Sequence, residues 1–338
     1  MKKSILIILL IIMVSFIVPI IFTQRFNFYR ASTNIIENET KDNIVNNYDY
    51  KEYKTVKLLH SKTNEIVEVK LDEYLYNVVS AEMPASFETE ALKAQAVVAR
   101  TYTIYKIINN NNKHGQADIC DDSTCCQAWI SKQDRLNKWE EQDREDCWLK
   151  ISNAVDSTAG KIITYNGEVI NAFFHANSGG VTEIPINVWG GSNYPYLQVV
   201  QTSGEDNYTQ YSSEVILTKQ QVVDKIKEKH NEIKINYDDE DAIKILEGTE
   251  GGRIRIIKFG NVNLSGVEAR TIFGLKSANF TVLVQGENVK FEVIGYGHGV
   301  GMSQTGADAM AKQGNDYMQI IYHFYNGVEI KDLWVKNV

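Results

Sequence analysis

The sequence predicts an α+β fold: a single large mixed domain, residues 55–338, that follows an N-terminal transmembrane helix. Two segments with a clear helical period, 71–82 and 88–108, predict helices. Short runs rich in apolar and β-branched residues predict strands spread over the rest of the domain. No internal repeat and no second domain boundary are visible, and the number of strands argues against a helical, lysozyme-like fold.

Length and charge limit the classes of function. With 338 residues, of which 43% are hydrophobic, the chain is long enough for one large domain or two ordinary ones and is not typical of a disordered protein. Its 35 basic and 43 acidic residues give a formal net charge of −8. This acidic balance argues against nucleic acid or an anionic lipid surface as the main partner.

The first 23 residues predict a membrane anchor. Lys2 and Lys3 precede an apolar run of about 18 residues, Ile5 to Phe22, close to the ~20 that cross a bilayer as a helix. The positive charge ahead of the run places the N-terminus inside and the body of the chain outside. A cleaved signal peptide is the alternative, but the run is long for a signal core and no small-x-small cleavage site follows it. We expect a cytoplasmic stub and transmembrane anchor over 1–23, a polar linker over 24–54 and an extracytoplasmic domain over 55–338.

Residues 71–82 have the spacing of an amphipathic helix whose apolar stripe also carries a carboxylate. Glu82 falls on this stripe, and Pro84 biases Met83 away from helical dihedrals, so the helix is expected to end close to Glu82. A second helix follows over about 88–108, with Ser86 as its candidate N-cap. The apolar stripe consists of Leu71, Tyr74, Leu75, Val78 and Val79. The second helix has a small-residue face that consists of Leu92, Ala96, Ala99 and Thr103.

Later segments alternate between strand-like and helical patterns, as an α+β fold requires. Strands are expected at 161–165, 169–174, 254–259, 281–284 and 290–294. Helices are expected at 303–313 and 317–325.

Glu82 has the position that a general acid requires. Burial removes water from its carboxyl group, and the negative end of the helix dipole lies at the last turn, so both effects favour the protonated form. A carboxylic acid that keeps its proton at neutral pH can protonate a leaving group. The alternative is an ordinary ion pair with a neighbouring Lys or Arg. On the second helix, Lys93 and Arg100 lie on roughly the same side, where they either hold a substrate or are surface cations.

His114, Cys120 and Cys126 form a candidate metal site because they are spaced by six residues each and carry the ligand types that zinc prefers. Cys125 or water is the candidate fourth ligand, and Cys147 joins if the chain folds back. A disulfide, such as Cys120 with Cys126, is the main alternative in an exported chain. A thiolate-rich zinc site is usually closed, so a structural role is expected for the ion.

Three long blocks of sequence resemble a known family. The first is AEMPASFETEALKAQAVVARTYT, from Ala81 to Thr103. The second combines FFHANSGGVTE with VWGGSNYPYLQVV, and the third is GYGHGVGMSQTGADAMAKQG, from Gly295 to Gly314. Over about 56–328 they are similar, in the same order, to the motifs of the stage II sporulation protein D family. An N-terminal membrane anchor also fits that family.

The resemblance implies a peptidoglycan lytic transglycosylase that acts during engulfment of the forespore in sporulation. Such an enzyme cuts the glycan between N-acetylmuramic acid and N-acetylglucosamine and leaves a 1,6-anhydromuramic end, with the glutamate of its EMP motif, here Glu82, as the catalytic acid. Members prefer glycan strands from which the stem peptides have been removed. The implied partners are the sporulation amidase, stage II protein P, and a membrane protein, stage II protein M. The implied location is the mother-cell membrane at the engulfing septum, with the C-terminal domain outside.

The central block implies further substrate contacts. His175, Asn177 and Ser178 offer polar groups on a strand-to-turn element in which glycines allow close approach of the backbone, and the resemblance favours sugar-binding roles for them. The alternative is a core histidine followed by an ordinary turn. Other residues expected near the cleft or in the core are Trp189, Tyr194, Tyr196, His298 and Gln304.

Two other functions remain open. A zinc-dependent amidase of the stem peptides would use His114, Cys120 and Cys126 as its centre, although hydrolytic zinc sites usually contain His and carboxylate ligands. A non-catalytic glycan-binding module would instead activate a peptidoglycan amidase. In that second case Glu82 has no chemical task, and Glu82→Gln leaves the function intact.

Overall fold

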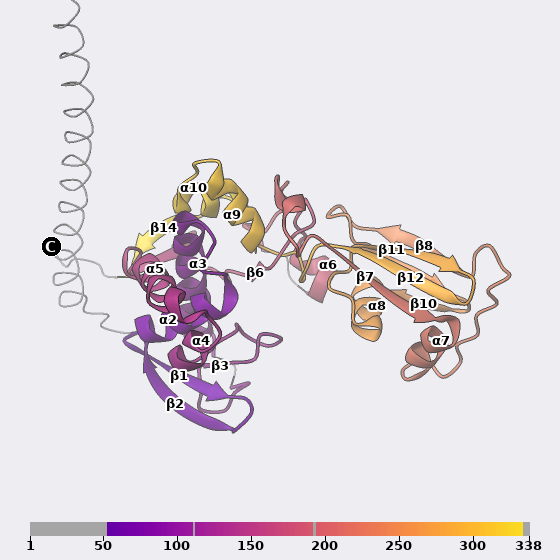
Figure 1. Ribbon diagram of the computed structural model, residues 1–338, viewed down its shortest axis with the longest axis horizontal. Helices are drawn as coiled ribbons and strands as arrows, with labels where there is room; N and C mark the ends of the chain where they lie inside the picture. Colours follow the sequence, from indigo (N-terminus) through magenta and orange to yellow (C-terminus); the bar gives the residue numbers. More distant parts are fainter. Residues whose placement is uncertain (1–52, 111, 192–193, 334–338) are drawn as a thin grey trace, which may run out of the picture. The chain divides into compact units, whose positions relative to one another are not determined.

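The computed structural model describes residues 53–110, 112–191 and 194–333 (Figure 1). Within these ranges helices and short strands alternate, which confirms the predicted α+β class. None of the helices in these ranges combines the length and the hydropathy that a membrane crossing needs. The predicted anchor, residues 1–23, and nearly all of the predicted linker lie outside the described residues.

Helix α2 (Leu71–Glu82) leads from a β-hairpin to Glu82. In the hairpin, β1 (Thr55–His60) pairs antiparallel with β2 (Glu65–Lys70), and the short β3 (Ile119–Cys120) runs parallel to β1. The predicted apolar stripe of α2 is buried along its whole length. The helix ends at Glu82 as predicted, because Pro84 follows: Met83 is extended, with φ −119°, and its N–H closes the last turn onto the Val79 carbonyl at 3.0 Å.

Helix α3 (Thr89–Ile108) is the central helix of the first hydrophobic core. The predicted small-residue face is fully buried, which is how one helix can have packed neighbours on several sides. The predicted N-cap was wrong. Ser86 lies inside a turn closed by the Phe87 N–H and the Pro84 carbonyl, and Glu88 takes the cap position without a side-chain cap. The main neighbours of α3 are α2, α5 (Arg144–Asp156), α9 (Gln304–Lys312), α10 (Tyr317–Phe324) and β4 (Lys161–Tyr165).

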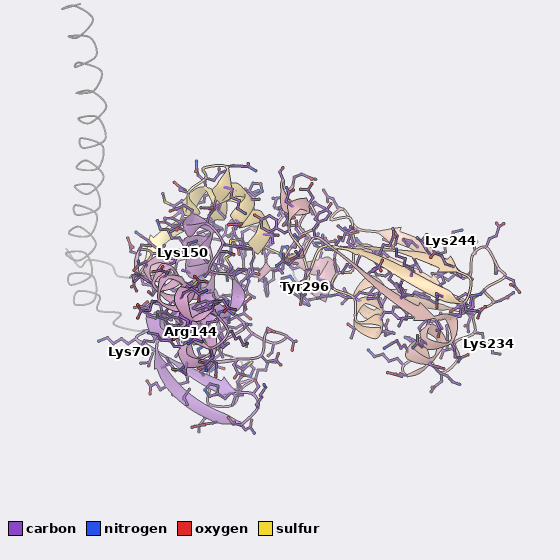
Figure 2. All side chains as sticks on the ribbon, viewed as in Figure 1. Lys70, Arg144, Lys150, Lys234, Lys244 and Tyr296 are labelled. Carbon is purple, nitrogen blue, oxygen red and sulfur yellow. The ribbon has the colours of Figure 1, made fainter. Side chains whose placement is uncertain are left out.

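The last strand closes the first core. β14 (Glu329–Asp332) pairs antiparallel with β4, with Ile330 opposite Ile163, and β5 (Glu168–Val169) lies on the other side of β4. Two short elements, α4 (Lys132–Leu136) and the 3₁₀ helix η1 (Glu141–Asp143), precede α5. From α5, the Lys150 Nζ (Figure 2) donates to the Phe87 carbonyl at 2.6 Å and so holds the loop between α2 and α3.

A second hydrophobic core lies between β7 and β12 in the chain, within the same compact unit, Tyr50–Val338. Two antiparallel sheets supply it, in the orders β11-β12-β7 and β10-β9-β8. The predicted strand at 254–259 is confirmed, and those at 281–284 and 290–294 are parts of longer strands. The elements are β7 (Ser212–Thr218), α7 (Lys219–Lys227), β8 (Ile243–Gly248), β9 (Ile254–Phe259), β10 (Val262–Ser265), α8 (Gly266–Phe273), β11 (Phe280–Gln285) and β12 (Asn288–Ile294).

The central sequence block forms short elements instead of the strand predicted at 169–174. β5 ends at Val169, because a local hydrogen bond from the Phe173 N–H to the Asn171 carbonyl bends the chain, and β6 (Phe174–His175) begins only after this bend. β6 pairs in parallel with β13 (Met302–Ser303), so the central and C-terminal blocks meet. Tyr296, labelled in Figure 2, forms a second bridge through two main-chain hydrogen bonds with Asn177. The helices α6 (Pro185–Trp189) and η2 (Glu205–Asn207) complete this region.

Arg100 does not have the substrate-binding role that the sequence predicted, because its side chain is fully buried. Its guanidinium donates to the carbonyl oxygens of Val155 at 3.1 Å, Thr158 at 2.8 Å and Lys161 at 3.3 Å. These carbonyls lie at the C-terminal end of α5 and at the start of β4. Arg100 therefore binds α3 to the carbonyl end of another helix, where a cation is favoured.

We expect Arg100→Met to lower the free energy of unfolding by about 3 kcal/mol, because it leaves several buried carbonyl groups without a donor. Arg255→Met is the matched control. Its guanidinium is about half exposed and pairs with Glu247 on the surface, so its loss is expected to cost less than ~1 kcal/mol. Urea unfolding of both variants measures the difference, and equal losses in the two would contradict the structural role.

Candidate functional site

The Glu82 carboxylate lies at the end of α2 between two hydrogen-bond donors. Its Oε1 accepts from the Ala128 N–H at 2.5 Å, and its Oε2 accepts from the Gln304 side-chain amide at 3.2 Å. The side chain keeps partial contact with solvent. Within the described part of the chain no lysine or arginine is among the groups that shift its pKa, so the alternative of an ordinary ion pair is not observed there.

Burial raises the pKa of Glu82 to about 7, and the hydrogen bonds from Ala128 and Gln304 partly offset this effect because they favour the ionised form. The pKa is raised in the direction that the sequence predicted, with burial as the main cause. At neutral pH both forms of the carboxyl group are therefore populated. A group in this state can give up a proton and take one back in the same reaction.

Gln304 links the site to α9 and α3. It is the first residue of α9 and is almost completely buried. Its side-chain Nε2 lies 3.2 Å from Glu82 and 3.4 Å from the Oε1 of Gln95, a fully buried residue of α3. Gln304 is thus in direct contact with Glu82.

Ala128 contributes its main chain, which no side-chain pattern in the sequence could reveal. The residue before it, Gln127, is buried and donates to the Tyr74 hydroxyl at 2.9 Å and to the Thr103 hydroxyl at 2.8 Å. These bonds fix the 127–128 segment to α2 and α3. The Ala128 N–H is therefore aimed at Glu82 by bonds to the two helices that flank it.

A cluster of one histidine and three cysteines lies just before this segment. The structure brings together His114, Cys120 and Cys126, as the sequence predicted, and adds Cys125, with all four ligand atoms within 4.8 Å of one another. The His114 Nε2 is 3.3 Å from the Cys126 Sγ and 3.7 Å from the Cys125 Sγ, and the two sulfur atoms are 3.9 Å apart. None of the chain's four cysteines forms a disulfide, and Cys147 lies outside the cluster.

The distances among His114, Cys125 and Cys126 fit a tetrahedral zinc ion. Zn–N bonds of about 2.1 Å and Zn–S bonds of about 2.3 Å place neighbouring ligand atoms roughly 3.5 to 3.8 Å apart. One imidazole and three thiols are also a ligand set that structural zinc sites use. The residues present therefore fit a closed zinc site.

The polar residues of the central block are buried, which disagrees with direct sugar contact. Asn177 donates to the Thr305 hydroxyl at 2.8 Å, and Ser178 hydrogen-bonds to Glu205 through its main-chain N–H at 3.1 Å and through its hydroxyl. The His175 Nδ1 contacts the Val300 carbonyl at 3.1 Å, and burial lowers the pKa of His175 to about 3, so the ring is neutral. All three side chains are more than nine-tenths buried. The predicted substrate contacts of His175, Asn177 and Ser178 are therefore wrong. These side chains form hydrogen bonds inside the protein instead.

Lys93 remains a candidate for substrate binding. Its ammonium group is partly exposed and pairs with Glu90 at 2.7 Å on the same helix. The other oxygen of Glu90 accepts from the Tyr317 N–H at 2.9 Å. Glu205, in contrast, was not singled out in the sequence, although it lies at the centre of the contacts made by the central block.

A cavity of about 630 Å³ lies between the loop after α2 and helix α9, and neither Glu82 nor Gln304 is among its lining residues. Pro84, two residues after Glu82, lines it, and so does Asp308, one helical turn after Gln304 on α9. The Asp308 carboxylate is buried and accepts from the Glu88 N–H, the Tyr208 hydroxyl and Lys312. The other wall residues include Ser86, Phe87, Asn207, Tyr208, Gln210 and Lys312.

An aromatic cluster lies on the central block. The Phe173 and Trp189 rings are 4.7 Å apart, and Trp189 lies 5.0 Å from His298. Trp189 is half exposed, so part of its ring is open to solvent. Tyr196 is buried and its hydroxyl accepts from the Asn171 N–H at 3.0 Å, which makes it a core residue.

Comparison with known proteins finds similarity over most of the chain. Residues 59–165 match the family described as Stage II sporulation protein. The chain is 34% identical to the stage II sporulation protein D of Bacillus subtilis (strain 168), over 81% of this chain and 78% of that protein. It is 32% identical to the stage II sporulation protein D of Bacillus amyloliquefaciens, over 82% of this chain and 79% of that protein. It is also 30% identical to a Bacillus subtilis (strain 168) protein named amidase enhancer, over 76% of this chain but 40% of that protein.

We expect Glu82→Gln to stabilise the protein at alkaline pH. A folded-state pKa of about 7, against 4.5 for the free group, means that the stability contributed by the protonated acid is complete below 4.5 and is lost as pH rises through 7. The variant has no such loss, so its advantage should grow between pH 4.5 and 7 to at most about 3 kcal/mol. Urea unfolding at pH 5 and pH 8 measures it, with Glu88→Gln, an exposed carboxylate, as the control. An advantage that does not change with pH would contradict the raised pKa.

Proposed function

The chain belongs to the stage II sporulation protein D family, and on that premise we propose that it is a peptidoglycan lytic transglycosylase with Glu82 as its acid. The observation that carries the proposal is a single carboxyl group with a pKa near 7, partly open to solvent and held by two hydrogen-bond donors. Among the described residues, no second carboxylate is among the groups that shift its pKa. A glycosidase that uses water ordinarily needs two carboxylates, whereas an intramolecular transfer needs one.

In the proposed reaction, Glu82 serves first as acid and then as base. Its proton goes to the glycosidic oxygen as the bond from that oxygen to the anomeric carbon of N-acetylmuramic acid breaks. The resulting Glu82 carboxylate takes the proton of the 6-hydroxyl group on the same sugar, and that oxygen bonds to the anomeric carbon. The products are a 1,6-anhydromuramic end and a free N-acetylglucosamine hydroxyl, and no water is consumed.

The two hydrogen bonds to Glu82 suit both halves of this reaction. Ala128 and Gln304 donate to the carboxylate, so they stabilise the ionised form that appears when the proton leaves. Burial opposes this and keeps the acid protonated often enough to start the reaction. Because each oxygen has its own donor, the carboxyl group is also held in one orientation.

The cavity beside Pro84 supports a polymeric sugar as the substrate. Its volume of about 630 Å³ exceeds that of one amino sugar, and it is walled by aromatic and polar groups such as Phe87, Tyr208 and Asn207. The half-exposed Trp189 is available as a stacking platform for another sugar of the strand. Lys93 stays in the proposal as a residue that contacts the glycan.

The family premise extends the proposal to the cellular context. We propose that the chain acts in sporulation at the mother-cell membrane, anchored by residues 1–23 with the domain outside, on glycan strands freed of stem peptides during engulfment. Its proposed partners are the sporulation amidase, stage II protein P, and the membrane protein stage II protein M.

The similarity to an amidase enhancer favours a second candidate function, a glycan-binding activator of a peptidoglycan amidase. The open cavity would serve this role equally well. The raised pKa of Glu82 would not be needed in it, and this is why we rank it second. A zinc amidase ranks lower, because a centre with three thiols leaves no open position when all four ligands bind.

We also propose that His114, Cys120, Cys125 and Cys126 hold a structural zinc ion. When bound, the ion supplies folding stability to the loop between α3 and α4. Cys126 lies two residues before Ala128, so the site also restrains the main chain that donates to Glu82. The chemistry assigned to Glu82 does not require the ion.

The full chain, solubilised in detergent, should release anhydromuramic ends from peptide-free glycan strands, and Glu82→Gln should lower the rate by at least about a hundredfold because the proton donor is lost. Mass spectrometry of the products measures both. The rate should fall as pH rises above about 7, where Glu82 is ionised.

Glu88→Gln is the control for this loss, since it removes an exposed carboxylate six residues further on. Reducing ends in place of anhydro ends would contradict the single-carboxylate reaction. No cleavage, together with stimulation of an amidase by both wild type and Glu82→Gln, would support the activator function instead.

Purified chain should contain one zinc ion, and Cys120→Ser and Cys126→Ser should lose it and unfold at lower temperature. Cys147→Ser is the matched control, because Cys147 is outside the cluster and its variant should keep the metal. Elemental analysis and thermal unfolding measure the two effects. Equal metal content in all three variants would contradict the assignment.

A further inference from the structure

Glu205 is a fully buried carboxylate surrounded by donors. Two main-chain N–H groups and four hydroxyl groups lie within hydrogen-bond distance of its two oxygens. They are the N–H groups of Ser178 at 3.1 Å and Gly180 at 2.9 Å, and the hydroxyls of Ser178, Thr202 at 2.6 Å, Ser303 and Thr305 at 3.0 Å.

These donors let Glu205 stay ionised without a direct cation partner among the described residues. Burial by itself would raise the pKa of Glu205, but the hydrogen bonds, led by those from Ser178 and Ser303, hold it below its ordinary value. Each donor that keeps its place stabilises a buried anion of this kind. Glu205 therefore determines the positions of three chain segments: 178–180, the loop at Thr202, and 303–305.

The third of these segments contains the partner of the catalytic acid. Ser303 and Thr305, which both contact Glu205, are the immediate neighbours of Gln304. Ser303 is also the N-cap of α9, where its hydroxyl oxygen accepts from the Gly306 N–H at 3.2 Å while its hydrogen goes to Glu205. One carboxylate thus fixes the main chain on both sides of Gln304 as well as the start of its helix.

We propose that Glu205 is a positioning residue: through Ser303 and Thr305 it holds the first turn of α9 so that Gln304 stays hydrogen-bonded to Glu82. Its role in the reaction rests on the proposed function of Glu82. The hydrogen bond between Gln304 and Glu82 does not depend on that function. Because a donor to the ionised form lowers a carboxyl pKa, loss of the Gln304 contact raises the pKa of Glu82.

This effect separates positioning from mere support of the fold. Gln304→Leu removes the donor directly and should move the pH at which Glu82 titrates upward by roughly half a unit, the effect of about one hydrogen bond. Glu205→Gln and Ser303→Ala should move it in the same direction by a similar amount. Thr202→Val is the matched control, since it removes a hydroxyl from the opposite side of Glu205 and leaves the contact with Ser303 in place. It should lower stability without moving the titration.

The titration is measured on the full chain, without substrate, from the pH dependence of the stability difference between each variant and the same variant carrying Glu82→Gln. A shift in Ser303→Ala and in Glu205→Gln, but not in Thr202→Val, supports the proposal. If Glu205→Gln does not fold, Ser303→Ala decides alone. A shift in Gln304→Leu without one in Ser303→Ala overturns the proposal and leaves Glu205 with a structural role only.

The alkaline limb of the glycan-cleavage profile is the second readout. In the variants that raise the pKa of Glu82 it should move to higher pH, because Glu82 then stays protonated up to a higher pH. If wild type cleaves no glycan while the titration shifts as expected, the positioning of Gln304 by Glu205 stands and the proposed function of Glu82 fails. If cleavage occurs and neither the titration nor the alkaline limb shifts, the positioning role fails and the proposed function stands.

Discussion

The hydrogen bonding of one partly buried carboxylate is the constraint on which the candidate site depends. Glu82 receives donors from segments 46 and 222 residues away in the sequence, Ala128 and Gln304. Burial pushes the carboxyl group toward its neutral form, and the two donors pull it back toward the ionised one. The balance gives a pKa near 7 only if all three segments keep their places. The packing of α2, α3 and α9 in the first core is therefore also what tunes the acid.

Other buried charges hold the chain together instead of binding a ligand. Arg100 satisfies carbonyl groups at the end of α5, and Glu205 gathers the N–H and hydroxyl groups of three segments. Arg253, just before β9, donates to the carbonyls of Ser178 and Val181 and so ties the second core to the central block. Each charge solves the same problem, because main-chain groups that leave regular structure inside a protein still need partners.

The cysteine cluster and the acid share one short stretch of chain. From Cys126 to Ala128 the backbone passes from the proposed metal ligands to the donor of Glu82, and Gln127 between them is bonded to α2 and α3. A structural ion at that place would influence the acid without touching the substrate, in the way that outer partners orient a functional group. This separates the contribution of the metal from the chemistry of the carboxyl group.

The sequence by itself determined many of the local elements and the place of the acid: α2 ends at Glu82 because Pro84 follows, and the small residues of α3 predicted a packing face. The ligand types in the sequence also predicted that His114, Cys120 and Cys126 form one cluster. Only the tertiary structure decided that Ala128 and Gln304 meet Glu82, that Glu205 organises the central block, and that Arg100, His175, Asn177 and Ser178 are internal. Periodicity reports which side of an element is apolar, whereas the burial of a polar side chain depends on donors and acceptors that distant segments supply.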